Sequence, residues 1–153
     1  MGSEARPEEL EVPYLQVEDP IELLGLVASR LQGEPCSKLA SVGITGTNGK
    51  TTTSYLLEGI LEASGRRPGL IGTVAYRTRA REIVAPYTTP TPVELQGLLT
   101  EMVDAGCDSL VMEVSSHGLE LGRVWGCDYQ VAAFSHLTQD HLDLHGSMEA
   151  YLE

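Results

Sequence analysis

The sequence predicts an α/β fold, a mostly parallel sheet of the P-loop type with helices on both faces. Three observations support this fold class. Short apolar runs typical of strands alternate with longer segments of helical periodicity, as in βαβ units. The first of these strands is followed by a glycine-containing loop and then by a helix. Polar turns follow the later strands, and in parallel sheets such turns gather beyond the carboxyl ends of the strands.

Composition limits the kind of protein. A chain of 153 residues, 42% of them hydrophobic, is long enough for one core and too short for two large domains. The formal net charge of −12 argues against a nucleic-acid partner, which requires a basic surface. The polar, acidic start of the chain is not a secretory signal, and no apolar run approaches the roughly 20 residues of a membrane span. We therefore expect no membrane partner and a cytoplasmic location.

The cysteines give no sign of a disulfide framework. Cys36, Cys107 and Cys127 are odd in number and match no metal-binding or redox spacing. This pattern suits a reducing cytosol, so we expect the thiols to be free.

The N-terminal part precedes the main pattern. Residues 1–20 contain three prolines among many acidic residues and are expected to form a loose arm. The apolar residues of 21–31 have helical spacing, which predicts a helix packed beside the rest of the domain. Gly33 and Pro35 end this helix before the first strand.

The strongest motif lies where the first strand, 42–44, meets the next helix. Gly46 and Gly49 allow the backbone to curl and to approach an anion without a clash at Cβ. Backbone N–H groups and the start of a helix then form a cradle for phosphate groups. Lys50 is expected to reach the β- and γ-phosphates of a nucleotide, and the Thr51 hydroxyl to bind Mg²⁺.

The loop departs from the strict pattern G-x-x-x-x-G-K-[ST], because Ile44 stands in the place of the first glycine. The alternative is an ordinary glycine-rich turn that caps a helix. A Gly-Lys-Thr core at a strand-to-helix junction favours phosphate binding. The residues expected to bind the nucleotide are Gly46, Thr47, Asn48, Gly49, Lys50, Thr51 and Thr52.

A second strand is predicted at residues 70–74. Residues 75–87 then form either an exposed hairpin or a strand with one basic face. The alternating arginines of this segment are expected to be solvated charges that protect an edge strand. They are Arg77, Arg79 and Arg81.

The second half of the chain continues the alternation. Residues 88–92 predict a rigid corner whose end starts a helix over 93–105. Strands are predicted at 109–114 and 130–134, and another helix starts at 147. Because ligands lie beyond the carboxyl ends of parallel strands, the glycine loop and the polar segments after these strands should converge on one crevice.

Two acidic segments are candidate metal sites. Glu113 ends a strand expected to be buried, and a buried carboxylate is costly unless it is paired or binds a metal. Glu113 could share Mg²⁺ with Thr51, or it could accept hydrogen bonds from backbone N–H groups. His141 lies between Asp140 and Asp143, a group of hard ligands that suits a second divalent ion.

Two other interpretations of these segments are weaker. His141 and His145 have the i, i+4 spacing of zinc ligands, but no Glu follows His141 and no Cys lies nearby. Ser115 and Ser116 precede His117, but the G-x-S-x-G elbow of hydrolases is absent. Substrate binding is the more economical role for the serine hydroxyls.

Four segments together resemble the Mur ligase family. They are 46–52, 88–90, 113–117 and 140–143. The resemblance runs from about Val12 to Glu153. The loop alone is also similar to folylpolyglutamate and cyanophycin synthetases, whereas the Thr-Thr-Pro corner and the Ser-Ser-His-Gly turn favour the Mur ligases. Within the family, the chain is most similar to the members that add the third residue of the peptidoglycan stem peptide.

The resemblance implies an ATP-dependent amide ligase of peptidoglycan synthesis. The γ-phosphate of ATP would activate the terminal carboxylate of UDP-N-acetylmuramoyl-L-alanyl-D-glutamate as an acyl phosphate, which the amino group of diaminopimelate or lysine would attack. The implied cofactors are ATP and Mg²⁺. The implied catalytic residues are Lys50, Glu113 and His141, the implied magnesium ligands Thr51, Glu113 and His141, and the implied contacts to the UDP-muramoyl peptide Thr88, Thr89, Ser115 and Arg123.

The chain departs from the family pattern at Leu121, where a polar substrate contact is usual, and at His136, where an asparagine is usual. We expect 1–38 to be a connector and remnant of a uridine-binding N-terminal domain, and 39–153 a partial ATP-binding central domain. We also expect the family's carbamylated lysine, which follows the position of Tyr151, and its C-terminal domain to lie outside this chain. The chain is therefore expected to be a fragment that is inactive alone, and the complete protein to be monomeric.

Two other functions stay open from the sequence. A P-loop phosphatase or kinase acting on a small molecule needs the loop but not the two later motifs. A regulatory module that binds a nucleotide without catalysis needs only the loop and its fold.

Overall fold

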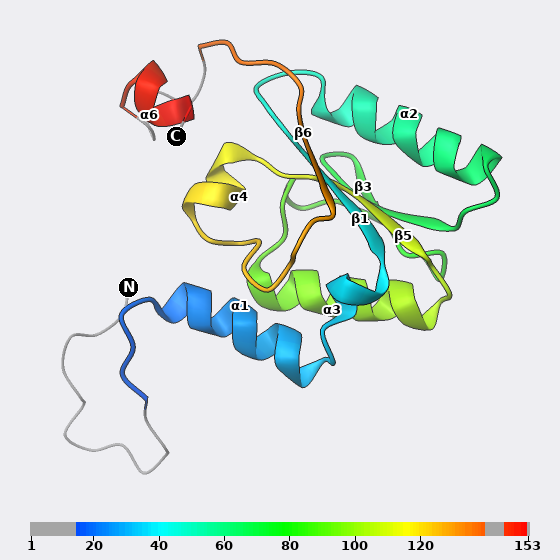
Figure 1. Ribbon diagram of the computed structural model, residues 1–153, viewed down its shortest axis with the longest axis horizontal. Helices are drawn as coiled ribbons and strands as arrows, with labels where there is room; N and C mark the ends of the chain where they lie inside the picture. Colours follow the sequence, from blue (N-terminus) through cyan, green and yellow to red (C-terminus); the bar gives the residue numbers. More distant parts are fainter. Residues whose placement is uncertain (1–14, 140–145, 153) are drawn as a thin grey trace.

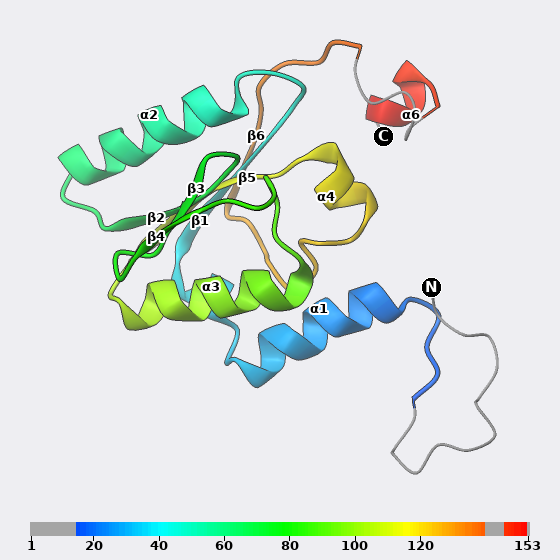
Figure 2. The same cartoon turned by 180° about the vertical axis from the view of Figure 1, so that it is seen from behind.

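The computed structural model describes residues 15–139 and 146–152 and has three layers (Figure 1). A six-stranded sheet lies between helix α2 (Lys50–Ala63) on one face and helix α3 (Pro92–Asp104) on the other. Helix α1 (Pro20–Leu31) packs against α3 (Figure 2). The predicted α/β fold with helices on both faces of the sheet is therefore confirmed.

The sheet has the strand order β4-β3-β2-β5-β1-β6. The strands are β1 (Ala40–Thr45), β2 (Pro68–Ile71), β3 (Ala75–Arg77), β4 (Glu82–Val84), β5 (Ser109–Glu113) and β6 (Val131–Phe134). Strands β2, β5, β1 and β6 run parallel, whereas β3 and β4 add an antiparallel hairpin at one edge. Three short helical segments complete the described part: η1 (Pro35–Lys38), α4 (Ser116–Glu120) and α6 (Met148–Leu152).

Local sequence signals account for the ends of the long helices. Helix α1 starts where Asp19 Oδ1 accepts hydrogen bonds from the backbone N–H groups of Ile21 and Glu22, at 2.8 and 3.0 Å. Gly65 follows α2 in the left-handed conformation, with φ of 84°, as a helix C-terminus commonly requires. The helix predicted at 21–31 is confirmed.

Two apolar clusters hold the helices to the sheet. The larger cluster lies on the α3 face and contains, among others, Leu95, Leu99, Met102, Leu110 and Met112. The smaller cluster lies on the α2 face and is built around Ile44, Leu70 and Val111. Successive residues of β5 therefore enter opposite clusters, as the alternation of a strand requires. All five residues of β5 are buried, as in a strand covered on both faces.

The segment after β2 differs from its prediction. The strand predicted at 70–74 ends at Ile71, because the chain turns back and pairs antiparallel as β3. Residues 75–87 contain the β3–β4 hairpin, which was one of the two predicted alternatives.

The prediction that the arginines of this hairpin are merely solvated was wrong for Arg77. Arg77 Nη1 lies 2.6 Å from a carboxylate oxygen of Glu58 on α2, and Arg77 Nε lies 3.0 Å from Glu82 on β4. The guanidinium carbon also lies 4.8 Å from the centre of the Tyr55 ring. Burial raises the pKa of Glu58, and the neighbouring Arg77 opposes that shift. Arg77 thus ties the hairpin to α2.

Three expectations drawn from composition concern membrane spans, the cysteines and the N-terminal arm. Within 15–139 and 146–152, no helix is long and apolar enough to cross a membrane. Cys36, Cys107 and Cys127 are buried free thiols, as predicted. The loose arm predicted at 1–20 falls mostly outside the described residues.

Replacing Arg77 with methionine should lower the free energy of unfolding by about 2 kcal/mol at pH 7, because Glu58 would stay buried without its charge partner. A carboxyl group whose pKa is higher in the folded state favours folding below its ordinary pKa of 4.5 and loses that contribution as the pH rises. The deficit of the variant should therefore shrink at pH 4. Urea denaturation at the two pH values measures both effects.

The matched control is Glu58→Gln, which keeps the side-chain shape and removes the charge. In this background Arg77→Met should cost much less than in the original chain. An equal cost in both backgrounds would show that the ion pair is not the reason for the loss.

Candidate active site

The loop between β1 and α2 has a backbone that requires glycine. Gly46 and Gly49 have φ of 128° and 87°, where other residues are strained. A Cβ atom at Gly46 would also lie within 2.4 Å of Ser135 Oγ. Gly49 occupies the cap position of α2 and provides no side-chain hydrogen bond to the first turn. The first N–H groups of α2 therefore receive no side-chain cap from Gly49, an arrangement that suits an anion.

Lys50 is the first residue of α2, and its side chain folds back over the loop. Its Nζ donates hydrogen bonds to the carbonyl oxygens of Gly46 and Thr47, at 2.5 and 3.2 Å. The ammonium group is therefore held directly above the backbone that would surround a phosphate. The role of Lys50 in binding phosphates stays a prediction.

Glu113 is completely buried at the end of β5, and three side chains surround its carboxylate. Thr51 Oγ1 donates to Oε2 at 2.8 Å, and Ser54 Oγ lies 3.3 Å from Oε1. Thr73 donates twice, from Oγ1 to Oε2 at 3.0 Å and from its backbone N–H to Oε1 at 3.1 Å. Glu113 thus accepts a backbone hydrogen bond, as the second sequence-based alternative expected, and it also contacts Thr51. The sharing of Mg²⁺ between Glu113 and Thr51 stays a prediction.

Ser54 and Thr73 were missed by the sequence analysis. The predicted strand 70–74 included Thr73, although Thr73 lies two residues beyond the carboxyl end of β2, where site residues gather. A correct strand end would have identified it. Ser54 gave no signal, because a serine one turn into a helix has no distinctive pattern.

The two threonines of the Thr-Thr-Pro corner have different surroundings. Thr88 is partly exposed and its Oγ1 lies 3.1 Å from Thr73 Oγ1. Thr89 is completely buried, and its Oγ1 accepts a hydrogen bond from the backbone N–H of Ser115 at 2.9 Å. Arg123 donates to the carbonyl oxygen of Thr89 at 3.0 Å. Thr89 therefore supports the start of the segment that follows β5.

That segment contains Ser115, which caps a helix. Ser115 Oγ accepts a hydrogen bond from the N–H of Gly118 at 3.1 Å, and α4 starts at Ser116. The stretch predicted as a polar turn at 115–118 is therefore mostly the first turn of α4. Ser115 lies in a cap and not in a hydrolase elbow.

Part of the loop, the start of α2 and residues of three other segments line a polar cavity of about 300 Å³. Its walls are Thr47, Asn48, Gly49, Lys50, Thr51, Thr52, Thr73, Thr88 and Ser115. The predicted convergence of the loop and the strand ends on one crevice is confirmed for these segments. A larger cavity of about 450 Å³ lies elsewhere and contains no residue of the loop. The smaller cavity is therefore identified as the candidate active site by the residues that line it, and its volume plays no part.

The segment that follows β6 also contacts the loop between β1 and α2. Ser135 Oγ donates to the carbonyl oxygens of Thr45 and Asn48, at 3.0 and 2.7 Å. The N–H of Thr47 donates to the carbonyl oxygen of His136 at 2.7 Å. Because His136 contacts the loop through its backbone, this contact does not depend on whether histidine or asparagine is present. Leu121, the other departure from the family pattern, is exposed at the end of α4.

The available donors fit the expected ligands. Two oxygen ligands, Thr51 Oγ1 and a Glu113 carboxylate oxygen, suit Mg²⁺, which binds few protein groups and takes further ligands from phosphates and water. The uncapped start of α2 and Lys50 suit the phosphates themselves. Within the described ranges, no three His, Cys, Asp or Glu side chains gather as a metal site. His141, Asp140, Asp143 and His145 lie outside these ranges, so the second metal site stays a prediction.

Gly46→Ala should destabilise the chain by about 1–3 kcal/mol, because its φ of 128° is unfavourable for alanine and the new Cβ would meet Ser135. The control is Gly59→Ala, at an exposed position within α2 where an added Cβ meets nothing within 4 Å. The control should stabilise the chain by about 0.5–1 kcal/mol. Urea denaturation gives the free energy of unfolding of both variants. Equal values would contradict the requirement for glycine at position 46.

Comparison with known proteins places this geometry in a family. The sequence matches the Mur ligase middle domain over residues 44–153. It is 49% identical over 146 residues to the UDP-N-acetylmuramoyl-L-alanyl-D-glutamate--2,6-diaminopimelate ligase of Bacillus cereus, covering 95% of this chain and 30% of the relative. It is 50% identical over 127 residues to the enzyme of the same name from Synechococcus elongatus, covering 83% of this chain and 26% of the relative.

Two solved structures resemble the fold. One is a UDP-N-acetylmuramoyl-L-alanyl-D-glutamate--2,6-diaminopimelate ligase, with a TM-score of 0.70 and 32% identity, covering 85% of this chain and 27% of that one. The other is E. coli FolC in complex with DHPP and ADP, with a TM-score of 0.65 and 23% identity, covering 92% and 39%. At that identity the second likeness concerns the fold alone. The chain spans about 30% of the length of the Bacillus relative, and it belongs to the Mur ligase middle domain family.

Proposed function

We propose that the chain is the ATP-binding part of a ligase that joins diaminopimelate to UDP-N-acetylmuramoyl-L-alanyl-D-glutamate in peptidoglycan synthesis. The observation that carries the proposal is a polar cavity lined by Lys50 and Thr51 together with two residues of other segments, Thr88 and Ser115. The substrates come from the names of the relatives, since those at 46 to 50% identity are diaminopimelate ligases.

The phosphate side of the cavity would bind ATP, which supplies the phosphoryl group that activates the substrate carboxylate. Gly46 and Gly49 let the backbone approach the phosphates closely, and the N–H groups at the start of α2 point toward them. Lys50 would exchange its hydrogen bonds to loop carbonyl oxygens for bonds to phosphate oxygens and would balance the charge that develops there.

The metal side of the cavity would hold Mg²⁺ between Thr51 and Glu113. Glu113 is already oriented by Thr73 and Ser54, so its carboxylate needs little rearrangement. His141 is proposed to serve a second Mg²⁺. This assignment rests on the family resemblance.

The remaining wall of the cavity would bind the UDP-muramoyl dipeptide. Thr88 and Ser115 line the cavity and present hydroxyl groups to it. Thr89 and Arg123 do not line the cavity. Arg123 is hydrogen-bonded to Thr89, however, and Thr89 is hydrogen-bonded to Ser115. We therefore propose that Thr88 and Ser115 bind substrate directly and that Thr89 and Arg123 position them.

The wider setting follows from the same proposal. We expect the complete protein to act in the cytoplasm as a monomer, on the UDP-muramoyl dipeptide and an amino acid. The net charge of −12 supports the absence of a nucleic-acid partner.

A folylpolyglutamate-type ligase is the second candidate. The loop at 46–52 favours it, because that loop alone is also similar to those of folylpolyglutamate synthetases. The same phosphate chemistry would serve both reactions, so the substrate side of the cavity decides between them.

Lys50→Ala should lower the affinity of this chain for ATP roughly tenfold and lower ligation by the complete protein at least about 100-fold, because a charged phosphate contact is lost. Nucleotide titration by calorimetry and a phosphate-release assay measure the two effects. The matched control is Lys38→Ala, which removes the other lysine of the chain, on η1. Ligation by Lys50→Ala at the rate of Lys38→Ala would rule out the phosphate assignment.

Phosphate release by the complete protein should require UDP-N-acetylmuramoyl-L-alanyl-D-glutamate together with diaminopimelate. Lysine in place of diaminopimelate, and a folate substrate in place of the UDP-muramoyl dipeptide, form the comparison arms. Turnover with lysine but not with diaminopimelate would mean that lysine is the amino acid that the protein adds. Turnover with the folate substrate alone would favour the second candidate.

A further inference from the structure

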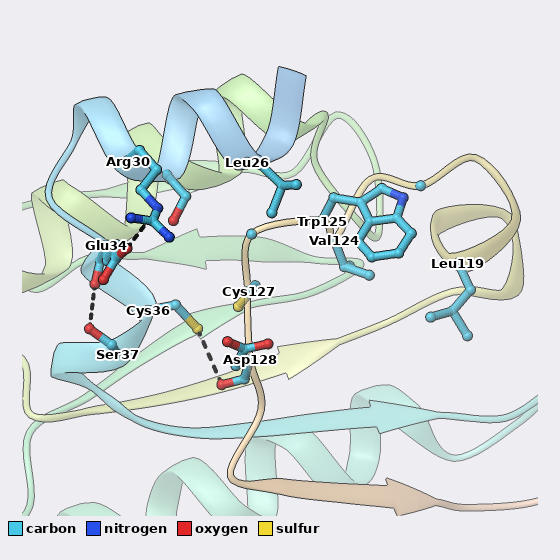
Figure 3. A pocket seen from close by; sticks show the side chains of 13 residues that line it. Leu26, Arg30, Glu34, Cys36, Ser37, Leu119, Val124, Trp125, Cys127 and Asp128 are labelled. Carbon is cyan, nitrogen blue, oxygen red and sulfur yellow. Dashed lines mark hydrogen bonds and ion pairs between the residues drawn. The ribbon is translucent and has the colours of Figure 1, made fainter. Parts of the chain in front are cut away.

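The larger cavity, of about 450 Å³, lies between α1, η1 and the segment that leads from α4 to β6 (Figure 3). Cys36 and Cys127 both line it, together with Leu26, Arg30, Trp125 and Asp128. Cys36 lies in η1, just before β1, and Cys127 lies just before β6. The two cysteines therefore lie at the amino ends of these strands, away from the phosphate loop at the other end of β1.

The two thiols are neighbours although more than half of the chain separates them. Both side chains line the same cavity, and Figure 3 shows both sulfur atoms beside it. Cys36 Sγ also lies 3.7 Å from the carbonyl oxygen of Asp128, the residue after Cys127. Ser41 Oγ donates to the same carbonyl oxygen at 3.1 Å, so the backbone beside Cys127 is fixed to the start of β1.

The surroundings distinguish the two thiols chemically. The neighbouring Cys127 side chain lowers the pKa of Cys36 in spite of burial. The same interaction and burial raise the pKa of Cys127. Cys36 is thus the thiol that ionises first, and the thiolate is the nucleophilic form of cysteine.

Both thiols are within reach of a small oxidant. The exposed fractions of Cys36 and Cys127 are only 3% and 8%, which excludes large reagents. The cavity beside them is many times larger than the roughly 30 Å³ that a water molecule occupies in the liquid, so a peroxide molecule fits within it.

We propose that Cys36 and Cys127 are a reversible oxidation site that closes to an intramolecular disulfide on reaction with a hydroperoxide. The Cys36 thiolate attacks one peroxide oxygen, which forms a sulfenic acid and releases hydroxide as the O–O bond breaks. The Cys127 sulfur then attacks the sulfenic sulfur, forming the S–S bond and releasing the sulfenic oxygen as water. Two thiols and one hydrogen peroxide thus give one disulfide and two water molecules.

The disulfide would join the segment that precedes β1 to the segment that precedes β6. These two strands are adjacent and parallel, and their far ends form and brace the phosphate loop. The site uses none of the residues assigned to ATP, metal or substrate, so it stands independently of the proposed function.

Peptide mapping of the native protein tests the proposal. After treatment with hydrogen peroxide, alkylation without reductant and digestion with trypsin, the peptide 31–38 should be found linked to the peptide that begins at Val124. Sequence places Cys36 in the first, Cys127 in the second and Cys107 in the separate peptide 82–123. Dithiothreitol should restore both free peptides.

Cys107 supplies the matched control. It is also buried, and its Sγ lies 3.7 Å from the carbonyl oxygen of Thr78. Cys107→Ser should leave the cross-link unchanged, whereas Cys36→Ser and Cys127→Ser should each abolish it. Recovery of Cys36 and Cys127 as unlinked thiols, as sulfinic acids or in links between molecules would overturn the proposal, as would a cross-link to Cys107.

Discussion

The arrangement of the candidate active site depends on one buried carboxylate. Glu113 has no exposed surface, and hydrogen bonds from Thr51, Ser54 and Thr73 compensate for the loss of water around it. A buried carboxylate without such donors would be costly, so the donors cannot move away freely. Because they come from α2 and from the turn after β2, Glu113 fixes both elements relative to β5. The same constraint orients the oxygen atoms that suit a metal ion.

Residues that follow β6 support the loop between β1 and α2. Ser135, just beyond β6, bonds to two loop carbonyl oxygens, and Thr138 bonds to Thr47 and Asn48. Glycine adopts the positive φ of these positions without strain, and the segment after β6 holds the loop in this shape. A phosphate site built on backbone groups requires this support, since its donors have no side-chain freedom with which to adapt.

An anionic ligand must bind against the net charge of −12. Exposed carboxylates act weakly at this distance, because salt screens their field within roughly 8 Å at physiological ionic strength. Lys50 and the N-terminus of α2 act at contact distance in a partly buried site. The local arrangement of charge therefore determines what the cavity can bind, and the total charge does not.

The sequence by itself determined the α/β class and the convergence of the glycine loop with the segment after β5. That the loop binds phosphate and that Thr51 and Glu113 share Mg²⁺ stay predictions. Hydrophobic periodicity and the positions of glycines are local signals, because each depends on residues that are close in the sequence. Such features can therefore be predicted without a structure. The resemblance to the Mur ligases added the family, which the match over 44–153 bears out. The direct substrate contacts and the role of His141 stay predictions.

Only the tertiary structure decided which distant side chains meet. Arg77 pairs with Glu58 because the hairpin folds beside α2, and Thr73 reaches Glu113 because β2 lies next to β5. Cys36 and Cys127 are neighbours because β1 and β6 are adjacent, although their spacing in the sequence matches no redox motif. Strand order creates these contacts, and the periodicity of a single segment carries no information about the strand that will lie beside it.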